Sequence, residues 1–132
     1  MLRKSILVIS DQHAPYHHID TLDFLKAIKL KYKPDCVVNI GDEMDWHSIS
    51  FHDSHPGLYS PSHELVVAKK FFQELEKIFP KQYIMDSNHG SLVFRKATKH
   101  GLPHEIFKSY NNMLGVGKGW TWHDDLIIKA SN

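Results

Sequence analysis

The sequence predicts an α/β fold in which helices flank a sheet whose neighbouring strands are parallel. Short apolar runs rich in β-branched residues alternate along the chain with longer segments of helical periodicity. Polar residues follow each of the first three apolar runs, and no internal repeat or shift in composition marks a second domain. We therefore expect residues 1–132 to form a single domain, with a functional site where the strands end on their carboxyl side.

The first three elements follow from periodicity and from the residues that interrupt it. Residues 5–10 and 36–40 are short apolar runs without helical periodicity, which predicts two buried strands. Between them, Asp20 is expected to cap a helix over residues 21–32, and Pro34 stops that helix. The apolar face of the helix is expected to contain Leu22, Leu25, Ile28 and Tyr32.

The rest of the chain predicts a longer helix followed by shorter elements. The longer helix begins between residues 60 and 62 and ends before Pro80. Its core face is expected to contain Leu65, Ala68, Phe72, Leu75 and Phe79. The remaining elements are expected at residues 82–86 (a third strand), 92–99 and 103–110 (short helices) and 120–129 (a last strand).

The overall composition limits the classes of function. The 16 basic and 15 acidic residues give a net charge of +1, which excludes a protein that binds nucleic acid through a strongly basic composition. The single cysteine, Cys36, lies in an apolar run, so we expect a buried, unreactive thiol and a reducing compartment. No apolar window is long enough to span a membrane, and the N-terminal run is too short for a signal peptide. These observations predict a cytoplasmic protein.

Polar residues that can bind metal gather after the predicted strands, in a chain with 11 histidines. Any one such segment would be typical of a turn or a helix cap. Because parallel strands end at the same edge of a sheet, three segments in this order predict one shared site. The segments are Asp11-Gln12-His13, Gly41-Asp42-Glu43-Met44-Asp45 and Asn88-His89.

These residue types suit the hydrolysis of a phosphate ester at two divalent metal ions. Two ions about 3.5–4 Å apart lower the pKa of a bound water and neutralise charge on the phosphoryl oxygens. A carboxylate can bridge both ions, while imidazole and a neutral amide oxygen complete the ligand set without added negative charge. A further histidine can donate a proton to the leaving oxygen if a carboxylate orients it.

The three segments resemble the motifs of the calcineurin-like metallophosphoesterases, which carry D-x-H, G-D-x-x-D and G-N-H-[DE] after successive strands. The first two patterns match in full, and the third keeps its Asn-His pair. The resemblance extends from residue 5 to about residue 90. It implies the fold of that family, with the metal site at the carboxyl ends of the strands.

The resemblance also implies a role for each matched residue. Asp42 would bridge the two ions, His89 would be the general acid, and Asp45 would orient His89. The expected metal is Mn²⁺, although a mixed set of ligands also accepts Zn²⁺, Fe²⁺, Ni²⁺ or Mg²⁺. The implied metal ligands are Asp11, His13, Asp42 and Asn88.

Three residues depart from the family's patterns. Ser87 stands where the family has glycine and Gly90 where it has an acidic residue, which predicts a differently shaped third turn. Trp46 stands where protein phosphatases with this pattern carry a phosphate-binding arginine. That difference, with a likeness to small phage and bacterial members, favours a phosphodiesterase or nuclease acting on DNA. A phage-encoded enzyme of this kind would work in the host cytoplasm.

The family completes its site with later histidines, a lone His and then a G-H-x-H segment, and this sequence contains no G-H-x-H. We therefore expect the chain to be a fragment that lacks the C-terminal half of the fold. His100, His104 and His123 remain as candidates, although His123 is expected in a hairpin turn before residues 126–128. Two rival functions are a small-molecule phosphomonoesterase or nucleotidase, and a catalytically incomplete domain that binds a partner.

The connection over residues 43–61 is rich in histidine and aromatic residues. One hypothesis is that it lines the substrate groove, with His47 and His52 nearest the metal ions. The alternative is a surface loop whose Phe51 and Tyr59 pack against the core.

Two further segments have weaker claims to a function. His17 and His18 follow the first motif and could contact a phosphate, although capping and solvent exposure are the roles we expect. The glycine-rich residues 115–119 lack the spacing of a phosphate-binding loop and predict a flexible turn.

Overall fold

The computed structural model describes residues 4–53 and 55–130. They form an α/β fold around a four-stranded sheet in which each strand pairs in parallel with the next, in the order β1-β2-β3-β4. This confirms the predicted fold class, and the common direction brings the carboxyl ends of all four strands to one edge. The strands are β1 (Ile6–Ile9), β2 (Cys36–Asn39), β3 (Gln82–Met85) and β4 (Trp120–His123).

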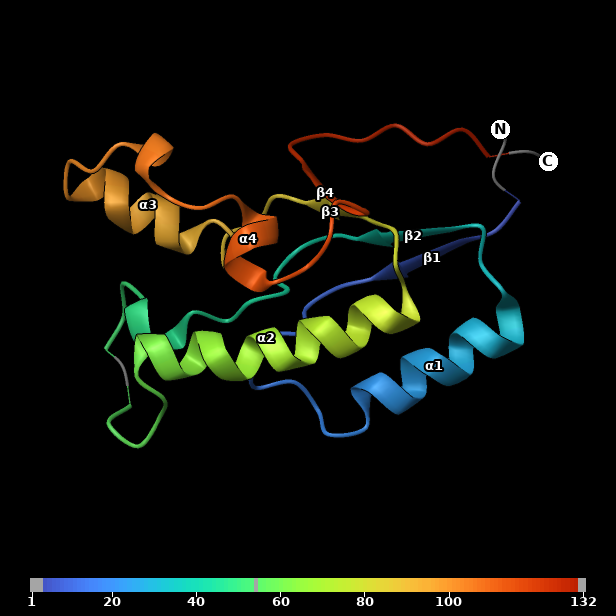
Figure 1. The fold of residues 1–132 in the computed structure, drawn as a ribbon, viewed down its shortest axis with the longest axis horizontal. Coiled ribbons are helices and arrows are strands. Elements are labelled where there is room, and N and C mark those ends of the chain that lie inside the picture. Colours follow the sequence, from blue (N-terminus) through green and yellow to red (C-terminus); the bar gives the residue numbers. More distant parts are fainter. Residues whose placement is uncertain (1–3, 54, 131–132) are drawn as a thin grey trace.

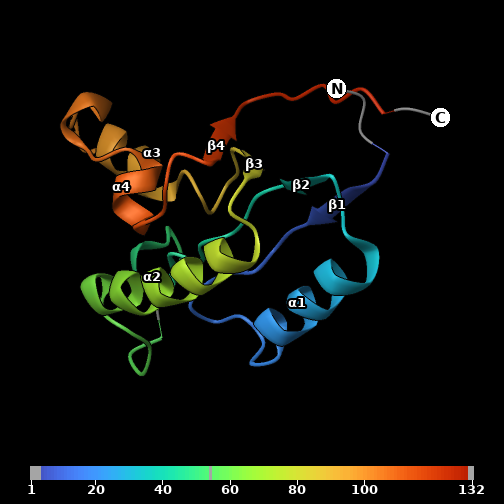
Figure 2. The same cartoon turned by 45° about the vertical axis from the view of Figure 1, so that its right-hand side comes forward.

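Two helices, α1 (Thr21–Tyr32) and α2 (Pro61–Ile78), lie on one face of the sheet (Figure 1; Figure 2). The apolar face predicted for α2 is confirmed, because its members are buried in the core or packed against it. Within the described ranges, no helix has both the length and the apolar character needed to cross a membrane. The main core residues between helices and sheet are Ile9, Leu25, Val37, Ala68, Phe72, Leu75, Ile84 and Trp120.

The two helices begin in different ways. Ser60 caps α2 as an extended residue whose Oγ accepts a hydrogen bond from the backbone N–H of His63 at 3.4 Å. Asp20 precedes α1 at the predicted position, but its side chain makes no capping hydrogen bond. Its φ of −86° and ψ of 2° differ from the extended backbone that a capping side chain requires. The predicted apolar face of α1 is also wrong at Tyr32, which is 60% exposed.

The prediction of a buried first strand is wrong, because β1 is an edge strand with one open face. Leu7 and Ile9 face the helices, whereas Val8 on the opposite face is 56% exposed. Residues 124–130 run back across this second face of the sheet (Figure 1; Figure 2). The sheet therefore has a full helical layer on one side and a partial cover on the other.

The short helices after β3 differ from the prediction in part. α3 (Leu92–Lys99) has the predicted bounds. The helix predicted over residues 103–110 is absent from the described chain, which instead forms a 3₁₀ turn, η2 (His104–Ile106), and then α4 (Tyr110–Leu114). Ser109 explains the difference, because its Oγ accepts a hydrogen bond from the backbone N–H of Asn112 and so starts a new helix at Tyr110.

The last strand is shorter than predicted. β4 ends at His123 and pairs in parallel with β3, so that His123 lies opposite Met85. The hairpin turn predicted at His123 is wrong, because residues 124–129 form no strand that could return beside β4.

The glycine-rich segment before β4 is packed tightly rather than forming the flexible turn that the sequence predicts. A Cβ atom added to Gly119 would lie 2.1 Å from the carbonyl oxygen of Pro80, so only glycine allows this approach. The backbone N–H of Gly117 donates a hydrogen bond to Oε1 of Glu76 on α2 at 2.7 Å. These contacts hold the start of β4 against the end of α2.

An aromatic cluster places α3 beside the carboxyl ends of the strands. The rings of Tyr110 and Trp122 stack at 4.9 Å, and Phe94 of α3 meets Tyr110 edge-on at 5.0 Å. Burial, followed by a hydrogen bond to Asp86, raises the pKa of the Tyr110 hydroxyl. The cluster joins α3 and α4 to β4 at the edge where the polar segments lie.

Candidate metal centre

The loops after β1 and β2 are joined by backbone hydrogen bonds. The N–H of Asp11 donates to the carbonyl of Gly41 at 3.1 Å, and the N–H of His13 donates to the carbonyl of Asp42 at 3.0 Å. Ala14 continues the pairing with a bond of 2.8 Å to the carbonyl of Glu43. The ladder of the sheet thus extends past the ends of the strands and aligns the first two predicted motifs.

Four non-glycine residues in these loops have the left-handed backbone that side chains normally avoid. A positive φ is uncommon outside glycine, and residues held there gather at functional sites. The backbone bonds between the loops hold Asp11, His13 and Asp42 in place. The residues are Asp11 (φ 53°), His13 (φ 47°), Asp42 (φ 54°) and Trp46 (φ 53°).

The third loop, after β3, is tied to the second by the side chain of Ser87. Its Oγ accepts hydrogen bonds from the N–H of Asp42 at 2.8 Å and from the N–H of Gly90 at 3.1 Å. In return, Oδ1 of Asp42 accepts a bond from the N–H of His89 at 3.1 Å. Gly41 leaves room for this contact, since an added Cβ would lie 2.4 Å from Cβ of Ser87.

These loops bring together three side chains that could hold a metal ion. One ligand atom each from Asp11, His13 and Asp42 lies within 4.8 Å of the others. Nδ1 of His13 is 2.8 Å from Oδ1 of Asp45, which leaves Nε2 as the ligand nitrogen, 3.7 Å from Oδ1 of Asp11. A histidine ligand whose other nitrogen contacts a carboxylate is the usual arrangement around protein-bound metals. The donor set therefore fits a divalent ion.

Asp45 also contacts His89, through its backbone. The carbonyl oxygen of Asp45 lies 2.6 Å from Nδ1 of His89, and a carbonyl can only accept, so Nδ1 carries the proton. The rings of His13 and His89 meet edge-on at 4.7 Å. His13, Asp45 and His89 form a second group whose ligand atoms lie within 4.8 Å of one another. The carboxylate of Asp45 thus contacts His13, while its carbonyl orients His89.

Asn88 lies beside this group and is exposed. Its backbone carbonyl accepts a hydrogen bond from Nη2 of Arg95 at 2.6 Å, which links the third loop to α3. Asn88 and His89 line a cavity of about 230 Å³, together with Ser50, Phe51, His52, Leu92 and Arg95. The six residues to which the resemblance gives a metal-binding or catalytic role therefore lie at the same edge of the sheet.

The three weaker site candidates are placed differently. His52 lines the cavity beside Asn88 and His89. His47 begins η1 (His47–Ile49), and its Nε2 accepts a hydrogen bond from the N–H of His55 at 3.3 Å. The structure does not bring His17 into either group of ligands. Its ring stacks on Phe71 at 3.9 Å, and burial lowers its pKa.

The connection that carries His47 and His52 is a surface segment, and the rings of Phe51 and Tyr59 do not pack into the core as the alternative predicted. Phe51 and Tyr59 are 43% and 42% exposed. Tyr59 stacks on Tyr16 at 5.9 Å. The segment is anchored by Glu64 of α2, which is fully buried and accepts hydrogen bonds from the backbone N–H groups of His47 and Ser48 and from the Ser48 hydroxyl.

Sequence reasoning missed Glu43 as a residue of the site. Its side chain is 1% exposed, and Oε1 accepts a hydrogen bond from Nε1 of Trp122 at 3.1 Å. Burial raises the pKa of the Glu43 carboxyl. A Cβ added to Gly90 would lie 2.9 Å from Oε1 of Glu43, so a larger residue at position 90 would clash with this carboxyl. The glycine at position 90 is the sequence feature that could have indicated this packing.

Comparisons with known proteins add little to the case for a metal site, which depends mainly on the geometry of the side chains. Neither the protein-family models nor the curated proteins give a match to the chain. A solved structure matches with a TM-score of 0.45 and 16% sequence identity, over 84% of this chain and 50% of the other. The chain spans about half the length of that structure. The case for a metal site therefore depends on the side chains described above.

Proposed function

We propose that this chain is a metal-dependent phosphoester hydrolase of the calcineurin-like metallophosphoesterase type. The observation that carries the proposal is the meeting of Asp11, His13 and Asp42 within 4.8 Å of one another, with His13 held by a carboxylate. Each of these residues occupies its place in the motifs that suggested the family. The three residues meet because the loops that follow parallel strands lie at the same edge of the sheet.

Asp11, His13 and Asp42 would hold one divalent ion, and Asp42 and Asn88 would hold a second. Mn²⁺ is the proposed metal, and Zn²⁺, Fe²⁺, Ni²⁺ and Mg²⁺ are alternatives for the same donors. Two such ions supply a nucleophile at neutral pH and neutralise the charge on the phosphoryl group. Asp42 suits the shared position because the N–H of His89 holds its Oδ1 at 3.1 Å and so orients a carboxylate that could serve both ions.

His89 is the proposed proton donor to the leaving oxygen. Its Nδ1 is held by the carbonyl of Asp45, so Nε2 is the nitrogen that can face a substrate. Asp45 therefore positions both histidines, one through its carboxylate and one through its carbonyl. A protonated Nε2 would carry the proton that the departing alkoxide needs.

The proposed substrate is a phosphodiester, with DNA as the leading candidate. The side chain of Asp11 is 64% exposed and Asn88 is exposed, so the described residues leave the metal ligands open to solvent on one side. These exposed ligands are accessible to a polymer as well as to a small molecule, so the choice of DNA depends on Trp46 and on the resemblance. Trp46 is buried at 4% exposure and offers no phosphate contact in place of the missing arginine.

The test compares the wild type with Asp42→Asn and His89→Ala in the presence of Mn²⁺. The substrates are bis-p-nitrophenyl phosphate, p-nitrophenyl phosphate and supercoiled plasmid DNA. Loss of the general acid should lower kcat by about 10²–10⁴-fold, and Asp42→Asn should weaken Mn²⁺ binding measured by calorimetry. Asp23→Asn on α1 and His18→Ala are the matched controls, and both should retain wild-type activity.

The proposal is wrong if Asp42→Asn and His89→Ala match the wild type on every substrate. Cleavage of the diester and the plasmid with little monoester cleavage would support the phosphodiesterase. Preference for the monoester would replace DNA with a small-molecule substrate. A wild-type chain that binds Mn²⁺ but cleaves no substrate would favour the partner-binding domain.

A further inference from the structure

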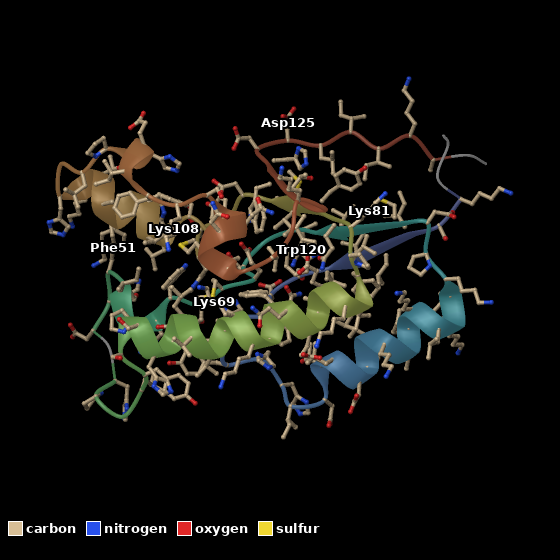
Figure 3. The ribbon with its side chains drawn as sticks, in the orientation of Figure 1. Phe51, Lys69, Lys81, Lys108, Trp120 and Asp125 are labelled. Atoms are coloured by element: carbon tan, nitrogen blue, oxygen red, sulfur yellow. The ribbon has the colours of Figure 1, made fainter. Side chains whose placement is uncertain are left out.

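Three cationic side chains of α3 surround a single aromatic ring beside the candidate metal centre. Nζ of Lys96 lies 4.3 Å from the centroid of the Phe51 ring, and Nζ of Lys99 lies 4.8 Å from it. Cζ of Arg95 lies 5.7 Å from the same centroid. Phe51 follows η1 and lies between that segment and α3 (Figure 3). We call Phe51, Arg95, Lys96 and Lys99 the cationic cluster.

The cationic cluster has no acidic counterpart in the described part of the chain. The ion pairs found there involve other residues, and none joins Arg95, Lys96 or Lys99 to a carboxylate. Three like charges around one ring repel one another, and the attraction of each cation to the ring face offsets only part of that repulsion. An anionic ligand would remove the imbalance. The whole chain has a net charge of only +1. The positive charge around Phe51 is therefore local to this surface and does not reflect a basic composition.

The cationic cluster is continuous with the candidate metal centre. Nη2 of Arg95 donates a hydrogen bond to the carbonyl of Asn88, one residue from His89. Phe51 and Arg95 line the same cavity of about 230 Å³ as Asn88 and His89. A chain of phosphates that lies along α3 would therefore lead directly to the proposed ligand and proton donor.

Phe51 is suited to stack on a base. Its side chain belongs to a residue that is 43% exposed, and the turn before it is held by the fully buried carboxylate of Glu64. A fixed aromatic ring beside cations that contact phosphates is the general arrangement by which proteins bind single strands. A duplex would keep its bases stacked internally and would leave Phe51 without a partner.

We propose that the cationic cluster binds a single strand of nucleic acid and guides it to the metal centre. Arg95, Lys96 and Lys99 contact backbone phosphates, and Phe51 stacks on a base. The direction of the strand toward Asn88 and His89 rests on the proposed phosphodiesterase function. The binding of the strand by α3 does not require hydrolysis, so the two proposals can fail separately.

The test measures the anisotropy of a fluorescently labelled single-stranded oligodeoxynucleotide in EDTA, so that no cleavage occurs. The variants are Phe51→Leu and the double variant Lys96→Gln/Lys99→Gln. Lys26→Gln/Lys31→Gln on α1 is the control, because it removes the same charge from a distant helix. Titrations between about 50 and 200 mM salt give the slope of log K against log salt concentration. Urea denaturation of each variant establishes that it is folded.

We expect Lys96→Gln/Lys99→Gln to weaken binding by at least about tenfold and to reduce the salt slope by about 1.4, the value for two lost phosphate contacts on a single strand. Phe51→Leu should weaken binding by about tenfold with an unchanged salt slope, because stacking involves no counterion release. The control should bind as the wild type does.

The proposal is overturned if the cluster variants bind as tightly as the wild type, or if the control loses as much affinity as they do. It is also overturned if a duplex or polyglutamate binds as tightly as the single strand and Phe51→Leu has no effect. Wild-type binding in EDTA without any hydrolysis in Mn²⁺ would contradict the proposed enzyme while leaving the strand-binding surface in place.

Discussion

Oδ1 of Asp45 lies 2.8 Å from Nδ1 of His13. This contact leaves Nε2 of His13 free to bind a metal ion and fixes the orientation of the ring. The resemblance implies that Asp45 orients His89, and in the structure the backbone carbonyl of Asp45, rather than its carboxylate, contacts Nδ1 of His89. One residue thereby fixes the ring orientation of two histidines.

Replacing Asp45 with asparagine should weaken metal binding without removing a ligand. The amide keeps the size of the side chain but loses the charge that holds and polarises His13, so we expect Mn²⁺ affinity to fall about 10–100-fold. Isothermal titration calorimetry measures the change, with Asp23→Asn on α1 as the control. Unaltered affinity in Asp45→Asn would show that the contact between Asp45 and His13 does not support a metal ligand.

Ser87→Ala should destabilise the junction of the second and third loops. Ser87 Oγ accepts hydrogen bonds from the N–H groups of Asp42 and Gly90, and both donors lose their partner in the variant. We expect the free energy of unfolding to fall by about 1–3 kcal/mol in urea denaturation. The control is Ser62→Ala, an exposed position where a change within about 0.5 kcal/mol is expected. Equal stability of the two variants would contradict the role of Ser87.

Glu64→Ala should destabilise the protein and release the turn that precedes Phe51. The buried carboxylate accepts three hydrogen bonds from His47 and Ser48, so its removal leaves buried donors without partners. We expect a loss of about 3 kcal/mol in the free energy of unfolding, and a smaller loss for Glu64→Gln, which keeps one acceptor. Glu74→Ala, at an exposed pair with Lys77, should change stability by no more than about 1 kcal/mol. If Glu64→Ala lowers the free energy of unfolding by no more than Glu74→Ala does, Glu64 does not anchor the turn.

His17→Phe should reduce the dependence of stability on pH. Burial lowers the pKa of His17 below its ordinary value of 6.5, so the unfolded chain binds the proton more readily than the folded one. The stability that neutral His17 contributes is therefore present above pH 6.5 and is lost as the pH falls from there through the lowered pKa. Phenylalanine keeps the stacking on Phe71 and cannot titrate.

The measurement for this prediction is the free energy of unfolding in urea at several values between about pH 5 and 8. The difference between wild type and His17→Phe should change across the acidic part of that range and stay constant above it. His18→Gln is the control, because the His18 side chain is 76% exposed. Parallel pH profiles for wild type and His17→Phe would contradict the prediction.

Much of the backbone architecture was predictable because its signals are local. The bounds of α1 and α3, Ser60 at the start of α2 and the alternation of strands with helices all follow from periodicity and capping residues. The exposure of β1 and the end of β4 at His123 were not predictable in the same way. The burial of a strand depends on its place in the sheet, and that place is decided by pairing between distant segments.

For the candidate site, the sequence by itself determined which residues gather at one edge, because each motif follows a strand and parallel strands end together. Only the tertiary structure decided their partners. Asp45 contacts His13 through its carboxylate, Glu43 is buried against Gly90, and the cations of α3 surround Phe51. Those contacts depend on left-handed loop backbones and on packing between segments that lie far apart in the chain, which residue spacing does not encode.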